Sequence, residues 1–195
     1  MKVFKFGGAS VKDAEGIKNV AHVVTTAGNE NVLMVISAMG KTTNALEEVI
    51  KNYFNKSNEL QASIQEVKKY HLQILLELFE DESNDAFFAV NSLFADLEYF
   101  IRSNKSPNYN FVYDQIVSFG ELISTTIVSH YFNEIGLKNT WLDVRNFIKT
   151  DTTYRDAIVD WEITQNLIAK GVDKKSISIT QGFLGSDSNS FTTTL

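Results

Sequence analysis

The most constraining feature of the sequence is a continuous apolar run at 31–37 (NVLMVIS), preceded by a helical pattern and a first strand-like segment. An apolar run of this length without alternating polar residues is typical of a strand buried on both faces of a parallel sheet. The first strand is expected at 1–6, and the helix between them is expected to begin after an Asp13 cap and to end at Gly28-Asn29. Strand, helix and strand in this order predict a right-handed crossover and an α/β fold with a mainly parallel sheet.

Two apolar stripes in the middle of the chain predict long helices that cover the sheet or a partner subunit. They consist of Leu60, Ile64, Val67, His71, Ile74 and Leu78, and of Phe87, Val90, Phe94, Leu97 and Ile101. The other patterns predict a helix from about Thr43, a loop at 103–110, helices at 111–132 and 160–170, strands at 141–144, 175–180 and 191–195, and a turn at 181–185. The 175–180 strand is expected to alternate between two faces, and Gly171 is expected to close the helix before it.

Composition excludes several classes of protein. With 195 residues, 44% apolar residues and no cysteine, the chain suits one domain without disulfides or cysteine-based zinc sites. A net charge of -6 argues against a nucleic-acid partner. The three histidines share no ligand spacing, so no residue is predicted to bind a metal directly. No signal peptide or membrane span is recognisable, so we expect a cytoplasmic protein that does not bind membranes.

The end of the first strand indicates a phosphate site. Lys5 precedes Gly7-Gly8, where backbone N–H groups can approach an anion and a lysine can add charge. A plain strand-to-helix turn with a surface lysine is an equally good interpretation of these few residues.

Two further strands are predicted to end in loops of small or polar residues, at 37–43 and at Gln181-Gly182. Ligands of parallel α/β sheets bind beyond the carboxyl ends of the strands, so the three loops are expected to converge. Gly40-Lys41-Thr42 is not a P-loop, because Val35 occupies the position of its first glycine. Adjacent Gly7 and Gly8 also fail the dinucleotide pattern.

The segment 5–11 (KFGGASV) resembles the signature of aspartate kinases, in which threonine is commoner than Ala9. Later blocks of that family are resembled in order by 37–44, 118–122 (SFGEL), 141–145 (WLDVR), 180–186 (TQGFLGS) and 192–195. Acetylglutamate, glutamate and uridylate kinases share the fold but are not expected to carry this set.

The resemblance implies a three-layer α/β/α amino-acid-kinase (carbamate kinase-like) fold, of which 1–195 would be the N-terminal, aspartate-binding portion. It also implies transfer of the γ-phosphoryl group of ATP, with Mg²⁺, to the side-chain carboxylate of L-aspartate, as in lysine, threonine and methionine synthesis. By position, Lys5 matches the family's phosphate-contacting lysine, and Gly7, Gly8 and Ser10 match its phosphate loop. Thr43 and Glu121 match substrate-contacting residues. Without the resemblance, Thr43 would be interpreted as a helix cap and Glu121 as a solvated carboxylate.

The printed sequence contains neither the Gly-Arg-Gly-Gly-Ser-Asp segment that follows in the family nor the nucleotide-binding half and the ACT regulatory domains. We therefore expect 1–195 alone to fold at least partly but to show no kinase turnover. A raw sheet edge near Leu195 and phenylalanine-rich helices are expected to favour a homodimer. A non-catalytic acceptor-binding or association module remains the alternative function.

Overall fold

Four parallel strands form the central sheet of the computed structural model, which describes residues 1–28, 30–173 and 175–195. The strands are β1 (Lys2–Phe6), β2 (Val32–Ile36), β3 (Asn139–Leu142) and β4 (Ile177–Gln181), in the order β1-β2-β4-β3. The parallel sheet expected from the 31–37 run is thereby confirmed. Its register aligns Lys5 with Val35 and Val35 with Thr180, so all three lie near the carboxyl edge.

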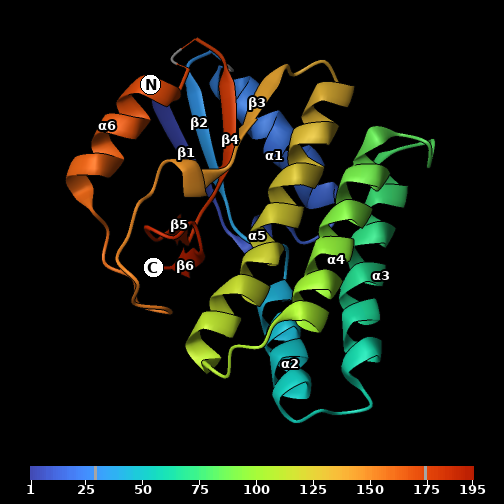
Figure 1. Ribbon diagram of the computed structural model, residues 1–195. Coiled ribbons are helices and arrows are strands. Elements are labelled where there is room, and N and C mark those ends of the chain that lie inside the picture. The colour runs from blue at the N-terminus through green and yellow to red at the C-terminus, as the bar shows by residue number, and fades with distance from the viewer. Residues whose placement is uncertain (29, 174) are drawn as a thin grey trace.

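Helices cover both faces of this sheet and make three layers. Figure 1 shows α1 (Ala14–Ala27) and α5 (Tyr109–Glu134) on one side and α6 (Trp161–Gly171) on the other. The side chains of β2 point alternately to the two faces of the sheet. Val32, Met34 and Ile36 are fully buried in the main core, whereas Leu33 and Val35 line an apolar cavity beneath α6.

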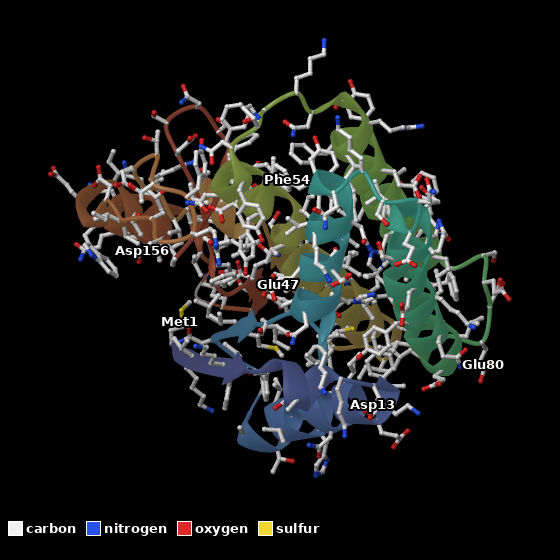
Figure 2. All side chains as sticks on the ribbon, turned by 90° about the horizontal axis from the view of Figure 1, so that it is seen from below. Met1, Asp13, Glu47, Phe54, Glu80 and Asp156 are labelled. Atoms are coloured by element: carbon white, nitrogen blue, oxygen red, sulfur yellow. The ribbon has the colours of Figure 1, made fainter. Side chains whose placement is uncertain are left out.

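The remaining helices extend the molecule to one side. α2 (Thr42–Phe54), α3 (Leu60–Leu78) and α4 (Asp85–Ser103) pack with one another and with α5, and every predicted stripe residue is buried except the partly buried Leu60. In Figure 2, Glu80, which follows α3, and Asp156, which precedes α6, lie at opposite sides of the molecule. None of the helices in the described ranges has the length and hydropathy that a bilayer-spanning helix needs.

Side chains cap the first turns of α1 and α5. Asp13 accepts a hydrogen bond from the Gly16 amide at 2.8 Å, as predicted for an N-cap. Gly28 ends α1 with φ +85°, while Asn29 lies outside the described residues. Asn108 caps α5, which therefore begins at Tyr109 rather than at Phe111.

Two predicted element boundaries were wrong for local reasons. The strand expected at 141–144 ends at Leu142, because Asp143 caps the short 3₁₀ helix Val144–Asn146. Gly171 is the last residue of α6 rather than a residue that closes it. A Cβ at Gly171 would lie 2.4 Å from the Phe147 ring, so glycine is needed there for packing.

The segment 175–180 was expected to alternate between a buried and an exposed face, and this prediction was also wrong. All five residues of β4 are buried, because β4 is a central strand with helices against both of its faces. The predicted turn at 181–185 contains the start of β5 (Leu184–Ser186).

The strand expected at 191–195 is present as β6 (Thr192–Thr194), which pairs antiparallel with β5 in a separate two-stranded sheet. The raw edge expected near Leu195 is absent along β6. Gln115 bonds the backbone of Thr192, and Asp114 accepts from the Thr194 amide.

Candidate active site

A cavity of about 450 Å³ opens at the carboxyl edge of the sheet. It is lined by Lys5, Val35, Ser37, Thr43, Glu121, Gly182, Phe183 and Leu195. These residues come from β1, β2, α2 and α5, and from the chain after β4 and β6. The loops after β2 and β4 therefore converge on one place, together with Lys5 near the end of β1.

Glu121 is the most unusual group in this cavity. Its side chain is 2% exposed, and its Oε1 accepts a hydrogen bond from the Ala38 amide at 3.2 Å. Oε2 is buried and has no hydrogen-bond partner among the residues that the structure describes. Burial raises the pKa of the Glu121 carboxyl from 4.5 to about 7, against the smaller lowering effect of the Ala38 N–H. A buried carboxylate with one unused oxygen is suited to accept a charged donor from a ligand.

The position of Glu121 depends on close packing of α5 against the loop after β2. A Cβ on Gly120 would lie 3.0 Å from the Ala38 Cβ, so this helical glycine permits the approach. Ser124 donates to the Ser37 carbonyl at 2.7 Å one turn further along. Together with the Ala38–Glu121 bond, this contact fixes the end of β2 to α5.

Lys5 and Thr43 complete the polar lining. Lys5 is exposed on the edge strand β1, and Thr43 is half-buried in the first turn of α2. The helix-cap interpretation of Thr43 was wrong, because α2 begins one residue earlier with Lys41 at the N-cap position. The Thr43 side chain is thus free of a capping role.

Gly7, Gly8 and Ser10 do not line the cavity. A Cβ on Gly8 would lie 2.6 Å from the Ala38 carbonyl oxygen, and the Gly8 carbonyl accepts from the Gly40 amide at 3.0 Å. Glycine at position 8 therefore allows the first two loops to pack together. The space around Gly7 is open, with no atom within 4 Å of a Cβ built there.

Ser37, Phe183 and Leu195 lie in segments that the sequence patterns indicate, but none of the three was predicted to belong to the site. Phe183 has a φ of +67°, uncommon for a residue other than glycine, and its carbonyl accepts from the Leu195 amide at 3.0 Å. A turn of this kind is not visible in the pattern of residue types. Asp143 and Arg145, which belong to the 141–145 block, form an ion pair at 2.6 Å and do not line the cavity.

A parallel sheet that gathers a lysine and a desolvated carboxylate at its carboxyl edge is suited to a small zwitterionic or phosphorylated ligand. The model of the "Amino acid kinase family" matches residues 1–194, and the chain belongs to this family.

Within the family, the chain is similar to aspartokinases, which confirms the predicted resemblance. It is 32% identical to aspartokinase 1 of Arabidopsis thaliana over 94% of this chain and 33% of that protein. It is 28% identical to the aspartokinase of Chlamydia trachomatis over 99% of this chain and 42% of that protein. The chain thus spans less than half the length of these curated relatives.

Solved structures agree on the fold. Escherichia coli aspartokinase III in complex with lysine and aspartate superposes with a TM-score of 0.89 at 27% identity, over 100% of this chain and 43% of that one. The same enzyme in complex with aspartate and ADP gives a TM-score of 0.88 at 26% identity, over the same shares of the two chains. The predicted amino-acid-kinase fold is therefore confirmed.

Proposed function

We propose that residues 1–195 are the aspartate-binding part of an aspartate kinase. Such an enzyme joins an oxygen of the side-chain carboxylate of L-aspartate to the γ-phosphorus of ATP and releases ADP, giving 4-phospho-L-aspartate for lysine, threonine and methionine synthesis. The observation that carries the proposal is the buried, unpartnered Oε2 of Glu121 in the cavity it shares with Lys5 and Thr43. Its support from comparison is the similarity to aspartokinases, one of which is described with aspartate and ADP.

Each proposed role follows from the chemistry of the side chain. Glu121 accepts the α-ammonium group of aspartate, an interaction that restores hydrogen bonding to its free oxygen. Thr43 offers a hydroxyl to the substrate. Lys5, exposed at the cavity, neutralises charge on the transferring phosphoryl group, because this reaction depends on positioning and on charge stabilisation.

Gly7, Gly8 and Ser10 are proposed to contact phosphate through the loop that they form, outside the cavity lining. The Gly7 side of this loop is open, so a phosphate group can approach its backbone closely.

Mg²⁺ is proposed to accompany ATP rather than to occupy a site built by this part of the protein. Within the described ranges, no group of three or more histidine, cysteine, aspartate or glutamate side chains is arranged to hold a metal ion.

Binding rather than turnover is the activity proposed for the 195 residues alone, because the chain matches only 33% to 42% of two single-function relatives.

A homodimer is proposed for the protein in solution. Its association would be visible as a concentration-dependent mass in sedimentation.

Calorimetric titration of the chain with aspartate at pH 8 tests the proposal. Aspartate should bind, whereas succinate, which lacks the ammonium group, should bind at least about tenfold more weakly, since a charged hydrogen bond contributes about 1.5–3 kcal/mol. Glu121→Gln should remove most of this preference.

The matched control is Glu80→Gln, an exposed carboxylate outside the site, which should bind aspartate like the parent chain. Equal binding of aspartate and succinate would refute the role of Glu121. A chain that binds neither compound but forms a stable oligomer would instead support the association module.

A further inference from the structure

The outer edge of β6 is held by side chains where a neighbouring strand would otherwise pair. Gln115 Nε2 donates to the Thr192 carbonyl at 2.8 Å, and its Oε1 accepts from the Thr192 amide at 3.2 Å. Two residues further along, Asp114 Oδ2 accepts from the Thr194 amide at 2.9 Å and Oδ1 accepts from the Thr194 hydroxyl at 2.8 Å. Consecutive residues of α5, together with the Ala157 amide, which donates to the Thr194 carbonyl at 3.0 Å, thus supply the hydrogen bonds of a missing strand.

Asp114 binds a second segment as well. Its Oδ2 also accepts from the Arg155 amide at 3.0 Å, in the loop before α6. The Asp114 side chain is fully buried, and three donors converge on it. The Arg155 guanidinium lies 4.3 Å from the centre of the Tyr113 ring, so Arg155 is bound at both its backbone and its side chain. A buried carboxylate with this many donors makes a rigid connection between segments.

This connection leads directly to the candidate active site. Thr194 is followed by Leu195, whose amide donates to the Phe183 carbonyl, and Leu195 and Phe183 both line the cavity of Glu121. Asp114 and Glu121 lie on the same helix, seven residues apart. Seven residues make almost two turns, so both side chains lie on one face of α5, about 10 Å apart along its axis.

We propose that Asp114 is a positioning residue of the aspartate pocket. By holding Thr194 against α5, it fixes the Leu195–Phe183 wall relative to Glu121, and it thereby keeps water from the carboxylate that receives the substrate ammonium group. The wall is thus attached to the same helix, α5, that carries the Glu121 carboxylate. The effect on aspartate rests on the proposed function, whereas the effect on the hydration of Glu121 does not.

The test is a carboxyl-carbon NMR titration of Glu121 in the 195-residue chain, followed by calorimetry with aspartate. In Asp114→Ala the wall loses its attachment to α5 at Thr194, while the Ala157 amide still donates to the Thr194 carbonyl. The loosened wall lets water reach Glu121, so the titration midpoint of Glu121 should fall by about one pH unit or more and the aspartate Kd should rise about tenfold. Asp114→Asn should behave like the parent, because its amide oxygen can accept both N–H groups while its NH₂ donates to the Thr194 hydroxyl. Gln115→Ala is the matched control, since it frees β6 only at Thr192.

An unchanged Glu121 midpoint in folded Asp114→Ala would overturn the proposal, as would an equal fall in Gln115→Ala. If Asp114→Ala does not fold, the Thr194→Val variant tests the proposal instead. Valine keeps the shape of the threonine side chain and removes the hydrogen bond from the Thr194 hydroxyl to Asp114 Oδ1. A lower Glu121 midpoint in that variant supports the proposal, and an unchanged one overturns it. A further outcome separates the two proposals. If neither the parent chain nor any variant binds aspartate, but the Glu121 midpoint still falls in Asp114→Ala, the proposed substrate is wrong and the positioning role of Asp114 stands.

Discussion

Glu121→Gln should stabilise the folded chain at alkaline pH. In the folded chain the Glu121 carboxyl is buried, its Oε2 has no partner, and burial raises its pKa from 4.5 to about 7. The folded state therefore retains a proton that the unfolded state releases near pH 4.5. Consequently this group lowers the free energy of unfolding as the pH rises from about 4.5 to about 7, and the loss is complete above that range.

The magnitude follows from the same two pKa values. Each pH unit between 4.5 and about 7 corresponds to about 1.4 kcal/mol, so an ionised Glu121 costs on the order of 3 kcal/mol. Glutamine has nearly the shape of protonated glutamic acid and carries no charge at any pH. The variant and the parent should therefore have similar stability near pH 5, and the variant should be more stable by about 2–3 kcal/mol at pH 8.5.

Urea unfolding of both chains between pH 5 and pH 9 is the assay. Other groups also change stability with pH. The pKa of His71 is lowered to about 4 by burial, for example, so His71 disfavours the folded state as the pH falls through about 6.5 towards 4. Subtracting one curve from the other removes these shared contributions. A difference that does not change with pH, or a variant less stable than the parent at pH 8.5, would refute the reasoning.

Substitutions at three other positions have clear expected outcomes. Lys5→Ala, placed in a kinase of the relatives' full length, should lower kcat about 100-fold with little change in aspartate affinity, and a near-normal kcat would exclude Lys5 from the chemistry. Gly120→Ala should destabilise the chain by about 1–3 kcal/mol in urea, because its Cβ would meet Ala38 at 3.0 Å; a more stable variant would show that this contact yields easily. Asp13→Ala should cost about 1 kcal/mol through loss of the α1 cap, whereas Asp13→Asn should retain most of it, and equal losses in both would contradict the capping role.

Local sequence determined the order and the type of most elements. The run at 31–37 predicts β2 because only a strand covered on both faces tolerates so many consecutive apolar residues. The helical stripes predict α3 and α4 because apolar residues at this spacing lie on one face of a helix. The ordered blocks also predicted the family, since several short motifs that resemble those of the family follow one another in the same order over the whole chain.

Tertiary structure decided which groups meet and which remain without partners. Periodicity places Glu121 on a helix, but only the approach of α5 to Ala38 shows that one carboxylate oxygen is bonded and the other is not. Likewise, the residue types at 192–194 predict a strand but not that the partners along its outer edge include the side chains of Asp114 and Gln115. The physical reason is the same in both cases. Desolvation and hydrogen-bond satisfaction depend on segments about 80 residues apart in the chain, and a local pattern carries no information about such distant partners.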